Sequence, residues 1–140
     1  MKPHPAFTPE HDAWRETVRR FVEREILPRA AAWDEAGEFP RELYRKAADA
    51  GLLGVGFPEA YGGTETAGEK PVADHFSRIV SAEEFARAGT GGLSASLFSH
   101  TIGAPPIAAV GSEELKRRVL PSILSGERSE ERRVGKECRL

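Results

Sequence analysis

The chain has 140 residues, of which 39% are hydrophobic and 30% charged, and its formal net charge is −2. This length fits one domain with a single core, and the composition is that of a soluble globular protein, not of a disordered or membrane protein. Acidic and basic residues are interspersed and no apolar run could span a bilayer, so we expect neither a nucleic-acid partner nor a membrane span. One cysteine and the absence of an apolar leader after Met1 predict a cytoplasmic protein without a disulfide framework.

Hydrophobic periodicity predicts helices along most of the chain. Apolar residues three and four apart predict one long helix over 11–33, and Pro28 should kink it because the ring displaces a backbone hydrogen bond. A second helix is predicted over 40–50, followed by Gly51, which can take the left-handed conformation that ends a helix. A third helix is predicted over 72–87.

The second half of the chain has a different character. Residues 92–103 carry small and apolar side chains but no charge, which is typical of a helix packed between other elements. Pro105 and Pro106 are expected to interrupt it. Ser112 is a predicted N-cap for a last helix that ends at Gly126. Strand signals are almost absent, so the sequence predicts an all-α bundle of about five to six helices.

No part of the sequence combines the residues of a complete active site. The four histidines are too scattered for a metal centre, so we predict no metal site. Residues 51–56 do not have the G-x-G-x-x-G spacing of a dinucleotide-binding turn. Glu83 and Glu84 are adjacent in a predicted helix and point in different directions, so we interpret them as a solvated face and not as an acid–base pair. We therefore predict no catalytic residue in this chain.

The uncharged segment is the candidate binding surface. On one helix over 93–102, five small or apolar residues would share a side: Ser94, Leu97, Phe98, Thr101 and Ile102. An ordinary core helix that packs against Phe76 and Phe85 would have this composition. One wall of an apolar ligand pocket, which needs apolar surface and a few polar groups, would have it too. The composition fits both alternatives.

Several ordered motifs give the chain a family resemblance. They are Ile26-Leu27-Pro28, Phe39-Pro40, the glycine-rich block 51–63 with Pro58-Glu59-Ala60-Tyr61-Gly62-Gly63, the segment 83–87, and the segment 103–127 that closes with Ser125-Gly126-Glu127. Together, over about residues 7–127, they resemble the N-terminal helical domain of the acyl-CoA dehydrogenase family.

This resemblance implies a function for a longer parent protein. Family members are FAD enzymes that remove two hydrogens across Cα–Cβ of an acyl-CoA thioester, usually pass electrons to an electron-transfer flavoprotein, and form homo-oligomers. The resemblance assigns Ser94, Leu97, Phe98 and Ile102 to the wall of the acyl pocket, where Phe98 would limit the depth. The catalytic glutamate and the region of flavin contacts have no counterpart in this chain, so cofactor-binding residues stay unassigned and the chain alone is expected to be inactive.

The sequence leaves two alternatives open and predicts one boundary. A flavin monooxygenase or nitroalkane oxidase of the same superfamily would share this domain, and a non-catalytic helical interaction module would share its pattern. We divide the chain into a helical domain over 1–127 and a charged tail over 128–140. The family pattern stops abruptly at Arg128, and the stretch to Arg139 resembles a translated sequencing-adapter oligonucleotide, so we interpret the tail and its Cys138 as non-native.

Overall fold

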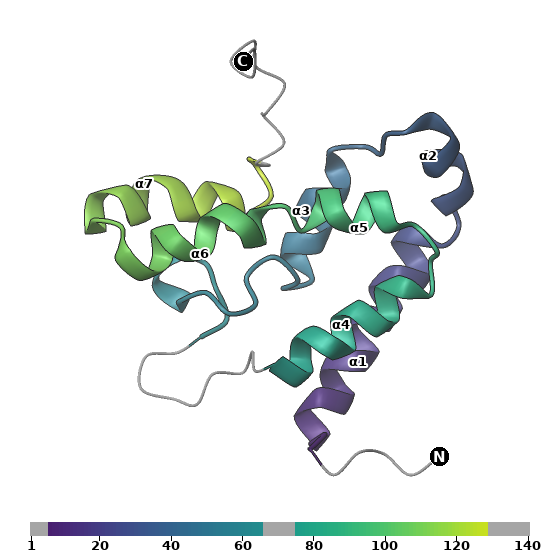
Figure 1. The fold of residues 1–140 in the computed structure, drawn as a ribbon, viewed down its shortest axis with the longest axis horizontal. Helices are drawn as coiled ribbons and strands as arrows, with labels where there is room; N and C mark the ends of the chain where they lie inside the picture. Colours follow the sequence, from purple (N-terminus) through teal and green to yellow (C-terminus); the bar gives the residue numbers. More distant parts are fainter. Residues whose placement is uncertain (1–5, 66–74, 129–140) are drawn as a thin grey trace, which may run out of the picture.

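The computed structural model describes residues 6–65 and 75–128, which form helices joined by short connections (Figure 1). The helices are α1 (Pro9–Phe21), the π-helical turn η1 (Val22–Ile26), α2 (Ala30–Ala36), α3 (Glu42–Asp49), the 3₁₀ turn η2 (Glu59–Tyr61), α4 (His75–Ala86), α5 (Gly91–Leu97), α6 (His100–Val110) and α7 (Glu113–Leu124). Within the described ranges the only β pairing is an isolated bridge between Pro58 and Glu65, so the predicted all-α class is confirmed.

The long helix predicted over 11–33 is divided into three pieces. After α1, the Leu27 N–H donates to the Val22 carbonyl at 2.9 Å, a bond to the fifth preceding residue that defines the π turn. Pro28 follows, and the chain re-enters a helix only at Ala30. The prediction placed the disturbance correctly but underestimated it: the helix breaks here, because a proline both lacks the N–H and crowds the preceding turn.

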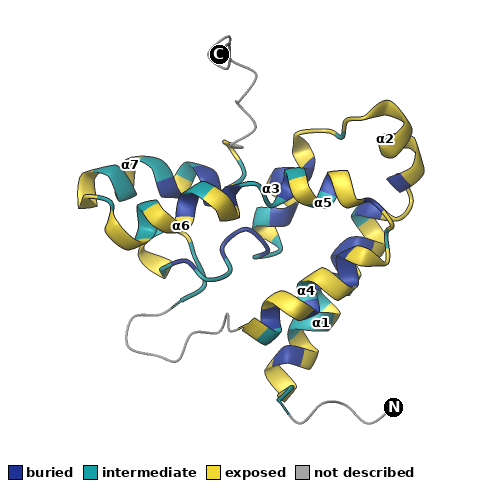
Figure 2. Ribbon diagram, viewed as in Figure 1, coloured by how far each residue is buried: buried dark blue, intermediate teal, exposed yellow. Residues whose placement is uncertain are grey.

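The larger core lies where α1 and η1 pack against α3, α4 and α5. Its buried apolar residues are Val18, Phe21, Val22, Ile26, Ala30, Leu43, Tyr44, Ala47, Leu52, Leu53, Phe85, Leu93 and Leu97. A second, smaller cluster joins the segment after α3 to α6 and α7 through Phe57, Ala104, Leu120, Ile123 and Leu124. Figure 2 shows a buried inner face on α4, whereas in α6 only His100 and Ala104 are buried.

The end of α3 has the predicted glycine geometry. Gly51 has a φ of +75°, and its N–H donates to the Ala48 carbonyl at 2.8 Å. The Leu52 N–H donates to the Ala47 carbonyl at 2.9 Å, and these two bonds form a Schellman motif. Leu52 then folds into the larger core. The helix stop predicted at this block is confirmed.

The uncharged segment differs from its prediction in two ways. It is not one helix, because the backbone leaves helical geometry at Phe98, where φ is −104° and ψ is 17°. The predicted interruption at Pro105 and Pro106 is wrong, since both lie inside α6. The carbonyls deprived of a donor belong to Thr101 and Ile102, which are exposed, so water can bond them and the prolines are tolerated there.

The last helix agrees with its prediction at both ends. Ser112 is the N-cap of α7, and its side chain accepts a hydrogen bond from the Leu115 N–H at 3.2 Å. Gly126 follows the helix with a φ of +74°, and a Cβ there would lie 2.5 Å from the Tyr44 carbonyl oxygen. Only glycine fits this close approach, which fixes the end of α7 against α3. Residues 129–140, most of the predicted tail, lie outside the described residues.

Candidate functional site

The four predicted pocket residues occupy three different environments. Leu97 has no exposed surface and belongs to the larger core. Ser94 is half-buried, and its hydroxyl donates to the Thr90 carbonyl at 3.2 Å, at the start of its own helix. Ile102 lies on the next helix, α6, and is 80% exposed. The break after α5 therefore separates residues that a continuous helix would have aligned.

Phe98 lies at this break, between the core and the surface. Its ring meets Phe85 edge-on with centroids 4.9 Å apart, so part of the core-helix alternative is correct. The other expected contact is wrong, because Phe76 packs edge-on against Phe7, with ring centroids 5.4 Å apart, at the far end of α4. Phe98 remains half-buried and so keeps a surface that a ligand or another polypeptide can contact.

One face of α6 is apolar and uncovered. Ile102 is 80% exposed and Val110, two turns further along, is 87% exposed. Pro105 and Pro106 lie between them and are also exposed. The sequence predicts an uncharged helix packed between other elements, but within the described residues this face has no such neighbour. Contiguous exposed apolar surface of this kind marks a site of interaction.

A cleft of about 1110 Å³ opens beside this region, between the α2–α3 connection, α5 and α7. Its walls include six apolar residues: Trp33, Phe39, Leu93, Ile107, Val119 and Ile123. None of the four predicted pocket residues lines this cleft. Sequence reasoning missed it because its lining combines residues from 33–44 and 90–96 with a few positions of α6, α7 and the residues after α7, which are far apart in the chain.

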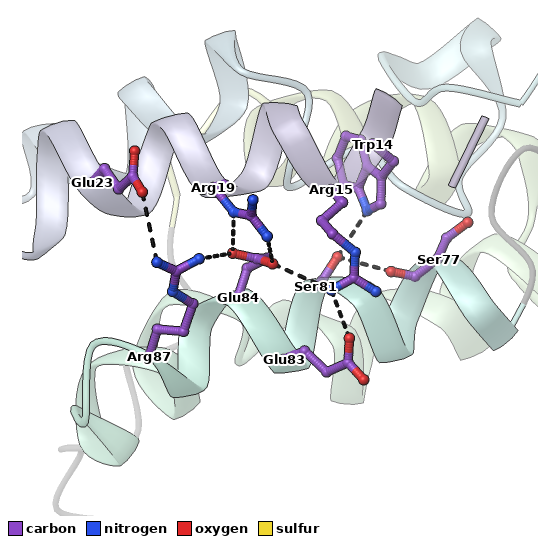
Figure 3. Close-up of polar contacts among 9 residues, drawn as sticks. All are labelled: Trp14, Arg15, Arg19, Glu23, Ser77, Ser81, Glu83, Glu84 and Arg87. Atoms are coloured by element: carbon purple, nitrogen blue, oxygen red, sulfur yellow. Dashed lines mark hydrogen bonds and ion pairs between the residues drawn. The ribbon is translucent and has the colours of Figure 1, made fainter. Parts of the chain in front are cut away.

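The predicted solvated face at Glu83 and Glu84 is half wrong (Figure 3). Glu84 is only 2% exposed and accepts hydrogen bonds from three guanidinium groups: Arg19 at 2.8 and 3.0 Å, Arg87 at 3.1 Å and Arg15 at 3.2 Å. Glu83 keeps a 52% exposed side chain and pairs with Arg15 at 2.6 Å. Glu84 is thus buried in an ion cluster, whereas Glu83 makes an exposed ion pair, although the two residues are adjacent in sequence.

The electrostatics of Glu84 exclude it as a proton acceptor. The hydrogen bonds from Arg19, supported by those from Arg15 and Arg87, lower the pKa of this carboxyl to about 2 although burial acts in the opposite direction. A general base must be poised near the working pH and must reach its substrate. Glu84 is ionised, enclosed and already bonded, so it joins α1 to α4 and has no catalytic part.

The buried histidine His100 also has a structural role. The carbonyl of Leu53 can only accept, so the His100 Nε2–H donates to it at 3.0 Å and ties α6 to the segment after α3. Burial lowers the pKa of this imidazole and favours the neutral form. Among the described residues no group of histidine, cysteine and acidic side chains could hold a metal ion. The helices of the described part also include none long and apolar enough to cross a membrane.

The glycine-rich block folds back on itself. A Cβ on Gly63 would lie 1.9 Å from the Phe57 carbonyl oxygen, so this glycine permits contact between two stretches of the same loop. The loop's amides are used internally: Gly63 N–H donates to the Pro58 carbonyl at 3.1 Å and Thr64 N–H to that of Gly54 at 3.1 Å. These contacts give the glycines at this end of the loop a structural role.

The fold and surface define a class of protein: a helical domain with an exposed apolar helix face and a neighbouring cleft. The family model described as "Acyl-CoA dehydrogenase, N-terminal domain" matches residues 8–127. The chain therefore belongs to the acyl-CoA dehydrogenase family, of which it carries the N-terminal domain.

Known relatives agree with this assignment. The mitochondrial long-chain specific acyl-CoA dehydrogenase of Sus scrofa is 38% identical over 120 residues, which are 86% of this chain but 26% of that protein. The crystal structure of an acyl-CoA dehydrogenase from Mycobacterium smegmatis is 45% identical with a TM-score of 0.76, over 88% of this chain and 31% of that one. An acyl-CoA dehydrogenase from Bacillus anthracis, solved in complex with FAD, is 32% identical with a TM-score of 0.68, over 89% and 20%. The chain thus spans between a fifth and a third of these relatives.

Proposed function

We propose that this chain is the N-terminal helical domain of an FAD-dependent acyl-CoA dehydrogenase, an enzyme that oxidises the Cα–Cβ bond of acyl-CoA thioesters. The bound FAD would accept the hydride from Cβ. Residues outside this chain would supply the base for the α-proton and the flavin contacts. We further propose an electron-transfer flavoprotein as electron acceptor, a homo-oligomeric complete enzyme and a cytoplasmic location.

The contribution of this chain is one wall of the acyl pocket. The observation that carries it is the uncharged surface from α5 to α6, where Ser94 and Phe98 are half-buried and Ile102 is exposed. Such a wall would exclude water from the reacting carbons and offer the alkyl chain apolar contact, which is what a largely apolar ligand site requires. Leu97 would support the wall from the core without contacting the ligand.

The test is a chimeric enzyme in which residues 8–127 replace the matched region of the Mycobacterium smegmatis protein. We expect the chimera to retain FAD and to lose flavin absorbance when acyl-CoA is added anaerobically. Phe98→Ala should then shift kcat/KM toward longer or bulkier acyl groups, because the ring that limits the depth is gone. Val110→Ala, at the end of α6 that is farther from Phe98 in the chain, is the control and should leave the profile unchanged.

The possible results separate the alternatives. An unchanged chain-length profile for Phe98→Ala would contradict the assignment of the pocket wall. A chimera that retains FAD but is not reduced by any acyl-CoA would contradict a part for this chain in binding acyl-CoA, and would leave open a flavin oxidase or monooxygenase of the same superfamily. A chimera that folds without retaining flavin would support a non-catalytic interaction module.

A further inference from the structure

A row of aromatic rings connects the two cores across the break between α5 and α6. In the larger core the ring centroids of Phe21 and Phe85 are 6.2 Å apart, and Phe85 meets Phe98 edge-on at 4.9 Å. The centroid of Phe98 lies 6.3 Å from that of His100, which lies 6.1 Å from Phe57 of the smaller cluster. Rings at these separations, within about 4.5–7 Å, attract one another. His100 is the member of this row whose ring also forms a hydrogen bond.

The imidazole of His100 is fixed by a contact that does not involve Phe98. His100 is 5% exposed, and its Nε2–H donates to the Leu53 carbonyl at 3.0 Å. Leu53 is itself 1% exposed and belongs to the larger core, so this acceptor is part of the packed interior. A buried carbonyl that loses its donor is costly, and the bond therefore fixes the orientation of the imidazole as well as the start of α6.

The backbone of Phe98 is held by hydrogen bonds, whereas its ring depends on its neighbours. The Phe98 N–H donates to the Ser94 carbonyl at 3.1 Å. The Phe98 carbonyl accepts from the N–H of Thr101 at 3.0 Å and from its Oγ1 at 2.7 Å. The ring is only half-buried, and among the described residues its aromatic neighbours are Phe85 and His100. A half-buried side chain keeps more rotamer freedom than an enclosed one, so these two rings limit where Phe98 can point.

We propose that His100 is a positioning residue for the wall of the acyl pocket: anchored to the Leu53 carbonyl, its imidazole restricts the Phe98 ring to the position in which it contacts Phe85, and so sets the depth of the pocket. This role rests on the proposed function, because Phe98 limits the depth only where an acyl chain is bound. His100 acts through Phe98 and does not touch the substrate. Acyl specificity thus depends on the glycine-rich block 51–63, which carries Leu53 but contributes none of the wall residues.

The first test compares acyl specificity in the chimeric enzyme. His100→Leu keeps apolar bulk but removes the ring and the donor to Leu53. We expect the ratio of kcat/KM for longer over shorter acyl-CoA to rise by at least about threefold, a fraction of the roughly tenfold or more that one methylene decides in an apolar pocket. His100→Gln keeps a planar group with an N–H donor and should restore most of the original ratio. A ratio that His100→Leu leaves unchanged, although Phe98→Ala shifts it, would overturn the proposal.

A second buried histidine provides the matched control. His11 is 6% exposed, and its Nδ1 accepts from the Thr8 N–H at 2.9 Å. Its ring packs against Phe7 and Phe76, with centroids 5.8 and 5.9 Å away, and has no part in the aromatic row. His11→Leu therefore removes a buried histidine with a backbone hydrogen bond and should leave the acyl ratio unchanged. An equal shift for His11→Leu would mean that any loss of packing alters the ratio, and would overturn the proposal.

A double variant separates positioning through Phe98 from a general structural role. Once Phe98→Ala is present, His100 has no ring left to position, so adding His100→Leu should shift the acyl ratio no further. Two substitutions that act independently would instead add their effects on a logarithmic scale. Retention of FAD by each variant shows that it has folded. Additive shifts for Phe98→Ala and His100→Leu would overturn the proposal.

The second test observes the ring directly and needs no turnover. A fluorine at the para position of Phe98 is followed by NMR, both in the chimera and in the chain by itself. We expect one narrow resonance, which His100→Leu moves, which His100→Gln returns toward its original position and which His11→Leu leaves in place. A resonance that His100→Leu does not move would overturn the proposal. If His100→Leu moves it but Phe98→Ala leaves the acyl ratio unchanged, the proposed acyl wall is wrong while His100 still positions the ring.

Discussion

The helix pair α1–α4 and the helix α6 differ in how far their side chains are paired and buried within the chain. Between α1 and α4, the polar groups find partners within the chain: Trp14 Nε1 donates to Ser81 Oγ at 2.9 Å, and three arginines surround Glu84. Two large apolar residues of α4, Val80 and Phe85, are buried, although Ile79 is 45% exposed. The buried polar groups at this contact are thus satisfied within the chain.

Around α6, in contrast, large apolar side chains are exposed. Ile102 and Val110 are the most exposed of the large apolar residues described. Close by, Thr90 buries a hydroxyl that has no partner in the described part of the chain. Exposed apolar side chains and a buried hydroxyl without a hydrogen-bond partner are both features that need an explanation, and a contact with another molecule would supply one. The contact between α1 and α4 therefore contributes to the stability of the chain, whereas the exposed residues of α6 contribute little, so mutations in the two regions should have different consequences.

The largest effect is expected from Leu97→Ala. Leu97 is fully buried in the core, so truncation should lower the free energy of unfolding by about 3 kcal/mol through lost transfer energy and a cavity. Ile102→Ala, on the exposed face, should change it by less than about 0.5 kcal/mol. Urea unfolding followed by circular dichroism measures both. Similar losses of unfolding free energy for the two variants would contradict the contrast between the core and the exposed face of α6, since Ile102 would then be packed within the chain.

Glu84→Ala should be nearly as damaging. The substitution removes the carboxylate that pairs with three guanidinium groups, and because these arginines are partly exposed we expect the free energy of unfolding to fall by about 2 kcal/mol. Glu83→Ala, one position earlier, breaks only an exposed pair and should cost less than about 1 kcal/mol. The same unfolding experiment tests the contrast. Equal losses would mean that burial of the carboxylate adds nothing to the α1–α4 contact.

The pH dependence of stability should follow from the same carboxylate. The pKa of Glu84 is about 2 in the folded chain against an ordinary 4.5, so the unfolded chain takes up this proton first as pH falls. The stabilisation is thus complete above the ordinary value and is lost toward pH 2, with about 2 kcal/mol gone by about pH 3. Glu84→Gln should lack this component. Urea midpoints of the two proteins that fall in parallel between about pH 5 and pH 3 would contradict it.

Local signals in the sequence were enough to predict most of the fold. The glycine at position 51, the cap at Ser112 and the apolar spacing of α1 and α7 act over a few residues, and the structure has each feature as predicted. The break at Phe98 could not be predicted in this way. There the backbone bends where the Phe98 ring packs on Phe85, and no local residue type marks that long-range contact.

The candidate surfaces were harder to predict for a related reason. Composition identified 93–102 as unusual, but not which of its residues would enter the core, because that depends on the partners across the helix break. The arginines around Glu84 come from α1 and from the end of α4, more than sixty positions away in sequence for two of the three, so the buried carboxylate looked like surface charge. The cleft combines several separate segments. Sequence motifs identify the family here, while three-dimensional contacts decide the role of each residue.

A smaller effect is expected at the start of α7. Ser112→Ala removes the side-chain acceptor for the Leu115 N–H and should cost about 1 kcal/mol, the usual value for an N-cap. Ser112→Asp should restore most of it, because aspartate caps equally well and carries a charge that suits the helix dipole. A loss that aspartate does not rescue would mean that Ser112 acts by packing. The result shows how far α7 is stabilised by its own sequence and how far by its neighbours.

The smallest effect on stability, and the most direct test of the exposed region, is expected from the pair Ile102→Glu and Val110→Glu. Both side chains are more than three-quarters exposed, so charges there should change the free energy of unfolding by less than about 0.5 kcal/mol. The isolated wild-type chain should self-associate at micromolar concentration through its uncovered apolar surface, and the double variant should sediment as a monomer. Val80→Glu is the contrasting change, because Val80 is fully buried between α1 and α4 and a charge there should unfold the chain. A wild-type chain that stays monomeric and stable would show that the exposed face of α6 tolerates water, and would favour the self-contained interaction module over the domain of a larger enzyme.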